Sequence, residues 1–501
     1  MRIPFKSDPV EFLQGQLFPG NLFDLLPKDH ECFVYDDIFH QIDTSAVELQ
    51  FSILGQHAYH PRLIVGILIY AYSQGIFSSR QIEKKCREDL GFMYISHMNC
   101  PNFRVLSDFR KNHYGFFKDC FVQSALLARD VGLVSLGHVS LDGSKFQANT
   151  SKHKAMNYKH LKEKENELIQ EIEALIQEAK ACDQEEDEEY KEKTGHEIPE
   201  ELKIKEKRPA KIQEAKKALE QREHDLNPDQ EIPDNKQISF ADTEARIMGK
   251  KGDFDYCYNG QISVDEDNQI IVGQHLSQNA NDKKEVEPAL QEMQETLGAL
   301  PTKVSADNGY LSGNNLQALE DAEVDAYVAT GREGKTESPL DASNRAVLKS
   351  DCAYRGEEDC FVCPGGHTLK VASTSKDGKK VYQATQEACS ACEYQSRCCK
   401  SKKGAPRTIH SDDKEPLRQD MIHKMQQEAS KDTYKKRKTI VEPVFGHIKN
   451  SGFRRFSVRG HKKASGEFSL VCAVHNFKKI VRALLNGVVC LEATKTAATA
   501  G

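Results

Sequence analysis

Helical hydrophobic patterns dominate the first quarter of the chain. Residues 63–72 form its most apolar run and predict a buried helix, which is too short to span a bilayer. Ser78 with Gln81 forms a candidate capping box at the start of the next helix. Asn102 is a candidate cap for a further helix over residues 103–113. The pattern therefore predicts a mostly helical segment up to about residue 135.

Two short helices joined by a turn in this segment could enter a DNA groove. The basic residues expected on their exposed faces are Arg80, Lys84, Lys85, Arg104, Arg110 and Lys111. An ordinary helical packing domain explains the same pattern. We assign residues 1–135 to a helical DNA-binding domain and leave the packing alternative open.

A strand pattern follows the helices. Val139 and Leu141 alternate with polar residues, as in a half-buried strand. Asp142 is expected at the end of this strand, and Gly143 comes directly after it. An acid in this position could belong to a functional site or could simply form a turn.

Alternation of strands and helices resumes after Gly252. Residues 256–264 and 269–277 predict a β-hairpin around the polar turn 265–268. A helix follows, with Asp282 as its candidate cap, and then a short strand with Asp307 at its carboxyl end. A further helix and strand complete an order that builds a mixed sheet with helices on its faces.

Two segments interrupt this alternation. Between residues 154 and 236 there are 24 acidic and 16 basic residues, with apolar residues at helical spacing. The apolar positions of the first stretch are Leu161, Leu168, Ile169, Ile172, Leu175 and Ile176. This composition predicts a helical hairpin or coiled-coil insertion with a solvated acidic linker.

Cysteines mark the second interruption. The chain has 15 of them, and seven lie between Cys352 and Cys399. Two C-x-x-C pairs predict a zinc-ribbon-like insertion, because each pair offers two thiolates to one tetrahedral site. The favoured ligands are Cys363, Cys389, Cys392 and Cys398, with Cys360 as the substitute. Free buried cysteines are the alternative, and the absence of an apolar signal core at the N-terminus favours a reducing cytoplasm.

Positive charge concentrates near the C-terminus, although the formal net charge of the whole chain is −7. Residues 431–463 contain eleven Lys or Arg and only two acids, Asp432 and Glu442. Such a surface attracts phosphate backbones whatever their sequence. A lone carboxylate in it, Glu442, is either a salt-bridge partner or a metal ligand that faces a bound phosphodiester.

Three acids could form one metal site. Asp142, Asp307 and Glu442 come from two strand ends and a helical segment. Mg²⁺ or Mn²⁺ prefers such oxygen ligands, and two ions can activate a water or a 3′-hydroxyl and stabilise the leaving oxygen. The sequence contains neither a P-loop nor a Rossmann fingerprint that would suggest other chemistry.

Four blocks of the sequence resemble successive blocks of bacterial insertion-sequence transposases with a DDE site. The blocks are VSLDGSKFQAN, NANDKKEVEPAL, SADNGYLS and YKKRKTIVEPVFGHIKNSGFRRFSVRG. The resemblance runs from the N-terminal helical segment to about residue 485 and implies a ribonuclease-H-like core that uses Mg²⁺. It also implies that Asp142, Asp307 and Glu442 are the catalytic acids.

The resemblance also implies a set of DNA contacts around the third acid. A Tyr, Arg, Glu, Lys signature would correspond to Tyr434, Arg437, Glu442 and Lys449. The gap between the Arg and the Glu is one residue longer than usual, so Arg437 and Lys438 are interchangeable candidates. Backbone contacts are expected from Arg454, Arg455 and Arg459, with surface charge as the alternative. Pro443 suggests that a helix starts or kinks at Glu442.

The predicted architecture is α/β, with a ribonuclease-H-like mixed sheet and flanking helices. The core comprises residues 136–153, 237–345 and 406–490, the helical insertion 154–236, the cysteine-rich insertion 346–405, and a disordered tail 491–501. The predicted function is a transposase, dimeric when it synapses two ends, that binds terminal inverted repeats and target DNA and no membrane. A non-transposing nuclease of the same fold and an inactive DNA-binding relic are the alternatives.

Overall fold

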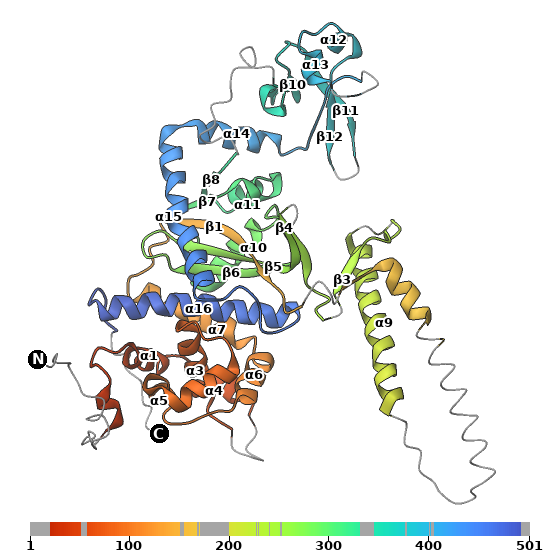
Figure 1. The fold of residues 1–501 in the computed structure, drawn as a ribbon. Helices are drawn as coiled ribbons and strands as arrows, with labels where there is room; N and C mark the ends of the chain where they lie inside the picture. Colours follow the sequence, from red (N-terminus) through yellow and green to blue (C-terminus); the bar gives the residue numbers. More distant parts are fainter. Residues whose placement is uncertain are drawn as a thin grey trace, which may run out of the picture. The chain divides into compact units, whose positions relative to one another are not determined.

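The computed structural model contains two compact units, which are considered separately (Figure 1). The first comprises residues 1–133, 450–453 and 469–501, and the second comprises 134–449 and 454–468. The structure describes residues 21–51, 58–150, 155–167, 170, 200–226, 228, 230–239, 241–250, 253–330, 345–375, 378–399, 401 and 405–491.

The first unit is helical. Its elements are η2 (Leu22–Leu25), α1 (Glu31–Phe39), α2 (Ser45–Glu48), α3 (Pro61–Ser73), α4 (Ser79–Glu88), α5 (Leu90–Ile95), α6 (Phe103–Asn112) and α7 (Phe116–Asp130). Helix α3 is buried along most of its length, which confirms the predicted buried helix. The carboxamide of Asn102 accepts hydrogen bonds from two backbone amides of α6, so its predicted capping role is confirmed.

Two local expectations for this unit are wrong. Ser78 precedes α4, but its side chain makes no capping hydrogen bond. Arg110 is not on an exposed face, because its guanidinium is buried and donates to Tyr72, Ser79 and the carbonyl of Phe77. It lies one helical turn after the buried Leu106, on the apolar face of α6.

A mixed sheet forms the centre of the second unit. Its strands are β1 (His138–Gln147), β4 (Arg246–Lys250), β5 (Asp253–Asp265), β6 (Ile271–Ser277), β7 (Lys303–Ala306) and β8 (Asp325–Val328). The order is β4-β5-β1-β7-β8, and β6 also pairs with β5. Strands β1, β7 and β8 are parallel, whereas β5 is antiparallel to β1. The predicted α/β alternation and the β5–β6 hairpin are confirmed.

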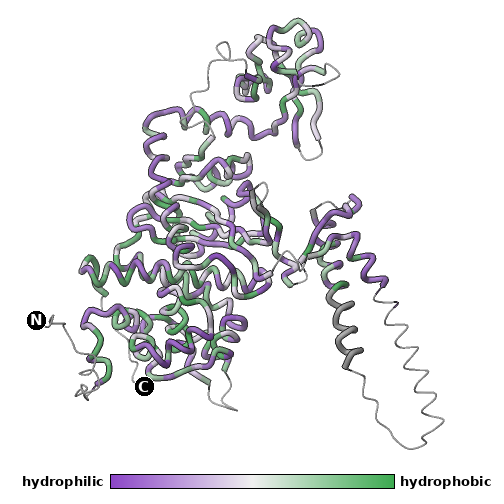
Figure 2. The backbone as a smooth tube through the Cα atoms, viewed as in Figure 1, coloured by the Kyte–Doolittle hydropathy of each residue, from purple (hydrophilic) through white to green (hydrophobic). Residues whose placement is uncertain are grey.

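Helices of the second unit connect and cover these strands (Figure 1). They are α10 (Val286–Leu297), α11 (Gly313–Asp321), α14 (Glu415–Gln426) and α15 (Glu428–Asn450). The first half of α15 is hydrophilic (Figure 2), and its second half packs apolar side chains on the sheet. Phe445 of α15 contacts Phe146 of β1, so α15 lies against the central strand.

Strand β1 is longer than predicted. Asp142 lies in the middle of the strand and not at its end, because the strand continues to Gln147. Beyond Asp142, β1 continues to pair with β5, and Gly143 lies opposite Gln261. The parallel pairing with β7 ends with Leu141 opposite Ala306, so Asp142 and Asp307 follow at the same level of the sheet.

Helix α15 runs through Pro443 without interruption, so the predicted helix start at Glu442 is wrong. Proline has no amide hydrogen for the carbonyl four residues earlier, which belongs to Thr439. The side-chain amide of Gln269 donates to this carbonyl at 2.8 Å. This tertiary hydrogen bond satisfies the orphaned carbonyl group.

The helical insertion is described in part. Strands β2 (Ala155–Asn157) and β3 (Gln237–Ser239) pair at its base, and helix α9 (Glu200–Leu226) packs on the helix 158–167. Their shared core comprises Tyr158, Leu161, Ile212, Ala215, Leu219 and Ile238. Two helices of the insertion therefore pack against each other, whereas the predicted apolar positions from Leu168 to Ile176 lie outside the described residues.

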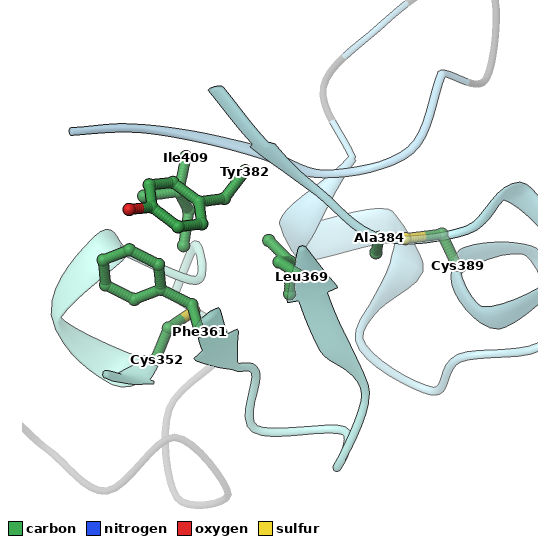
Figure 3. Packing of buried hydrophobic residues seen from close by; sticks show 7 residues of the cluster. All are labelled: Cys352, Phe361, Leu369, Tyr382, Ala384, Cys389 and Ile409. Carbon is green, nitrogen blue, oxygen red and sulfur yellow. The ribbon is translucent and has the colours of Figure 1, made fainter. Parts of the chain in front are cut away.

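The cysteine-rich segment contains five antiparallel strands, β9 (Ala353–Arg355), β10 (Cys360–Val362), β11 (Thr368–Thr374), β12 (Lys380–Gln383) and β13 (Thr408–Ser411). Three short helical turns, η5 (Lys349–Asp351), α12 (Gln386–Ser390) and α13 (Gln395–Cys398), accompany them. Its small core comprises Cys352, Phe361, Leu369, Tyr382, Ala384, Cys389 and Ile409 (Figure 3). Apolar packing thus contributes to the stability of this segment.

The last helix, α16 (His461–Leu485), belongs to both units. Its apolar side chains Leu470, Ala473, Phe477 and Ile480 are buried. From Ser469 onward these residues belong to the helical unit, where Asn476 donates to Ser124, and not to the catalytic core as predicted. None of the described helices is long and apolar enough to cross a membrane.

Candidate functional site

Two of the predicted acids lie side by side on adjacent parallel strands. Asp307 directly follows β7, and its Oδ1 accepts a hydrogen bond from the amide of Gly309 at 2.8 Å. Asp142 lies in β1, where its Oδ1 accepts from the amide of Gly143 at 2.9 Å. These local hydrogen bonds orient the two carboxylates, and the β1–β7 register brings them together.

Arg437 of α15 joins the two carboxylates. Its Nη2 lies 3.2 Å from Asp142 Oδ1 and 4.0 Å from Asp307 Oδ2. The Arg437 side chain is only 6% exposed, compared with 19% for Asp142 and 42% for Asp307. Its Nε is buried and has no hydrogen-bond partner within the described part of the chain. The carboxylate pair therefore already accommodates a cation.

The Asp142 carboxyl group is held in an unusual electrostatic environment. Burial raises its pKa to about 6, and Arg437 opposes this rise. The neighbouring carboxylates of Asp307 and Asp282 add to the rise in pKa, because a second negative charge disfavours ionisation. A perturbed carboxyl next to a charged partner is typical of a functional site.

The third predicted acid, Glu442, lies on the exposed side of α15. It is five residues after Arg437, which corresponds to about 140° around the helix. Within the described residues, no three His, Cys, Asp or Glu side chains are arranged to hold a metal ion. Asp142 and Asp307 therefore meet as a pair, and the role of Glu442 stays a prediction.

Lys449 lies on the same side of α15 as Glu442, as their seven-residue spacing predicts. Its ammonium group donates to the hydroxyl of Ser144 and lies over the ring of Phe146. Burial lowers the pKa of Lys449, and the charge of Arg454 lowers it further. The lysine thus lies beside β1, two residues along the strand from Asp142.

Asp282 is a carboxylate whose place in this site the sequence analysis missed. It does not cap α10, because that helix begins at Val286 and Glu285 occupies the N-cap position. Its Oδ1 instead accepts hydrogen bonds from Asn259 at 2.8 Å and Gln261 at 2.6 Å. The available signal was its position in the loop after β6. Strand β6 pairs with β5, which in turn pairs with the strand that carries Asp142.

The predicted DNA contacts are distributed along α15 and the loop that follows it. Arg454, Arg455 and Arg459 are exposed, as is Lys438, whereas Tyr434 is half-buried. Backbone hydrogen bonds between Gln147 and residues 454 and 456 fix this loop along the end of β1. The loop that carries the three arginines is therefore hydrogen-bonded to β1, the strand that contains Asp142.

Two protein-family models match this chain and identify the family to which it belongs. A family model described as a transposase DDE domain matches residues 362–481. A second, described as a transposase domain (DUF772), matches residues 20–112. Two separate parts of the chain thus match transposase families. The chain belongs to the DDE transposases. It is a DNA transposase, and its family implies an enzyme that hydrolyses or transfers nucleotidyl groups.

Comparison with solved structures adds little to this assignment. A piggyBac transposase synaptic complex with hairpin DNA, solved by cryo-electron microscopy, is 9% identical, with 96% of this chain and 80% of that chain covered. The TM-score of 0.30 is too low to support any argument about the fold. No curated protein matches the transposase.

The cysteine-rich segment of the transposase contains a small cavity of about 20 Å³. Five thiols line it, those of Cys363, Cys389, Cys392, Cys398 and Cys399. Gly365 leaves room for them, because a Cβ at this position would lie 2.8 Å from the sulfur of Cys392. Cys360 does not line this cavity, and its sulfur lies 3.6 Å from a carboxylate oxygen of Glu358.

Proposed function

We propose that this transposase cuts the ends of its own element and joins the freed 3′-hydroxyl groups to target DNA at one site. The pairing of Asp142 and Asp307 around the Arg437 guanidinium carries the proposal, because two carboxylates from adjacent strands there accept a positive charge. Carboxylate oxygens on rigid strands are suitable ligands for Mg²⁺ or Mn²⁺.

The donor set at this site fits a hard divalent cation. Asp142 and Asp307 would bind it, and Glu442 on α15 would complete the shell of a second ion. Such ions activate a water or hydroxyl nucleophile and stabilise the leaving oxygen of an in-line displacement. Lys449 would hold the phosphate next to these acids, since its ammonium group lies beside Ser144. Arg437 would neutralise the carboxylates before the cation arrives.

DNA would approach the end of β1. Arg454, Arg455 and Arg459 are exposed on the loop fixed there and would contact phosphates, together with Lys438 and Tyr434. The helical unit would recognise the terminal inverted repeats, and two copies of the chain would hold two ends together. The reaction would take place in the bacterial cytoplasm, on nucleoid DNA.

The cysteine cavity would hold one structural Zn²⁺. The thiols of Cys363, Cys389, Cys392 and Cys398 would be its ligands, and their gathering around Gly365 supports this. Cys399 replaces Cys360 as the substitute, because Cys399 lines the cavity and Cys360 does not. Metal analysis of the purified chain tests this: one zinc per chain that is lost in Cys392→Ser is expected, and a zinc-free native protein contradicts it.

A strand-transfer assay with labelled element ends tests the catalytic proposal. Asp307→Asn should abolish cleavage and leave end binding largely intact, because it removes a ligand charge without changing the shape of the side chain. Asp321→Asn, on the exposed end of α11, is the matched control and should cut normally. Normal cutting by Asp307→Asn would refute the assignment. Cutting without joining would indicate a nuclease, and binding without cutting would indicate a relic.

A further inference from the structure

Asp282 presents one carboxylate oxygen toward the predicted catalytic pair. Its Oδ2 lies 3.1 Å from the point where a Cβ on Gly309 would be, and Asp307 Oδ1 lies 2.9 Å from the same point. On the other side, its Oδ1 lies 2.9 Å from the corresponding point on Gly143, the residue after Asp142. The Asp282 carboxylate is therefore placed between the segments that carry both acids.

Glycine at both positions leaves the space that this carboxylate occupies. A side chain on Gly143 would approach Gln261 Nε2 to 2.2 Å, and one on Gly309 would approach Asp307 Oδ1 to 2.9 Å. Neither glycine has a left-handed backbone conformation. Close approach by Asp282 and its hydrogen-bond donors, and not backbone geometry, therefore explains why a larger residue does not fit here.

Fixed amide groups hold Asp282 in this orientation. Asn259 and Gln261 of β5 both donate to its Oδ1, and the Tyr310 hydroxyl donates to the side-chain oxygen of Gln261. The Asn315 amide donates to the backbone carbonyl groups of Asp282 and Tyr310. With Oδ1 occupied by two donors, Oδ2 is the oxygen available to a cation.

Two buried polar atoms at the same place lack partners. Asn259 is fully buried, and its Oδ1 makes no hydrogen bond within the described residues. This oxygen lies 3.0 Å from the same Gly143 point as Asp282 Oδ1 does. The buried Nε of Arg437 also has no partner in the described structure, but as an N–H donor it cannot bind a cation. The unsatisfied Asn259 oxygen beside charged side chains therefore indicates a site that a ligand completes.

We infer that Asp282 is a fourth acidic residue of the active site. Its Oδ2 binds the divalent cation once the cation replaces Arg437 and draws the carboxylates of Asp142, Asp307 and Asp282 together, because among the described residues these groups are not yet arranged as a metal site. The inference rests on the proposed function, since it needs a cation at this pair. It assigns Asn259 and Gln261 as positioning residues that orient the Asp282 carboxylate. Arg437 then occupies the cation position in the metal-free protein, where its guanidinium lies beside the carboxylates of Asp142 and Asp307.

Mn²⁺ binding to the full chain, followed by electron paramagnetic resonance without DNA, tests the inference independently of activity. Asp282→Asn keeps the oxygen that accepts from Asn259 and Gln261 and loses the charge. We expect its Mn²⁺ affinity to fall by about tenfold or more, as in Asp307→Asn. The control Asp321→Asn should bind Mn²⁺ as the unmodified protein does.

The outcomes separate the inference from the proposed function. Weak binding in Asp307→Asn with normal binding in Asp282→Asn would overturn the inference and leave the function standing. Normal binding in both variants would overturn the metal site itself. If Asp282→Asn does not fold, Fe²⁺-directed cleavage of the unmodified chain replaces it. Backbone cuts near residues 142, 282 and 307 support the inference, and cuts near 142 and 307 alone contradict it.

Discussion

A single methyl group at Gly143 should damage both stability and catalysis. In Gly143→Ala the new Cβ would lie 2.2 Å from Gln261 Nε2, 2.9 Å from Asp282 Oδ1 and 3.0 Å from Asn259 Oδ1. Carbon–nitrogen contacts in proteins are rarely closer than about 3.4 Å, so Gln261 must move by about 1 Å. It cannot do so freely, because it is hydrogen-bonded to Asp282 and to the hydroxyl of Tyr310.

The cost has two parts. Overpacking a filled site costs about 1–3 kcal/mol. Loss of the hydrogen bond from Gln261 to the Asp282 carboxylate adds about 1.5–3 kcal/mol, because bonds to charged groups are stronger than average. The free energy of unfolding of the second unit should therefore fall by about 3–5 kcal/mol. In a unit of about 330 residues the loss lowers the melting temperature by roughly 4–7 °C.

Urea unfolding and thermal melting of Gly143→Ala measure this cost, and the cleavage assay measures its effect on the acids. Gly446→Ala is the control, because a Cβ there meets nothing within 4 Å and alanine favours a helix over glycine by about 0.5–1 kcal/mol. Gly446→Ala should be slightly stabilised and fully active. A Gly143→Ala protein of normal stability and activity would show that Gln261 and Asp282 do not pack against Gly143 as described.

Three further predictions concern charged and capping residues. Arg437→Met should destabilise the metal-free protein by about 3 kcal/mol, because it leaves the Asp142 carboxylate without the Arg437 guanidinium. Mg²⁺ should then raise the melting temperature of this variant more than that of the unmodified chain. An equal rise in the two proteins would contradict the prediction. Burial by itself raises the pKa of Glu415, but hydrogen bonds from Lys349 and Ser411 outweigh it and hold the pKa below its ordinary value. The stabilising contribution of Glu415 is therefore present above about pH 4.5 and is lost as the pH falls through the lowered pKa. The stability difference between Glu415→Gln and the unmodified chain should therefore shrink in acid. A difference in urea unfolding that does not depend on pH would refute this prediction. Asn102→Ala should cost about 1 kcal/mol in the helical unit by removing the α6 cap, as measured by thermal melting, and an unchanged melting temperature would contradict the cap.

Sequence patterns predicted most elements but misplaced several of their ends. The capped helix α6, the β5–β6 hairpin and the strand before Asp307 follow from periodicity and turn residues. The continuation of α15 through Pro443 does not, because it depends on a hydrogen bond from Gln269 in another element. The length of β1 depends on pairing with β5, so Asp142 lies in the middle of a strand.

The sequence by itself determined which residue types could do the chemistry and that Asp142 and Asp307 belong to strands of an α/β unit. Only the tertiary structure decided which of them meet. The parallel register of β1 and β7 brings Asp142 and Asp307 together, and α15 adds Arg437 between them. Asp282 lies near them and does not cap a helix, because the side-chain amides of Asn259 and Gln261 on β5 donate hydrogen bonds to its carboxylate. Local patterns encode hydrogen bonds within an element, whereas these contacts depend on side chains far apart in the chain.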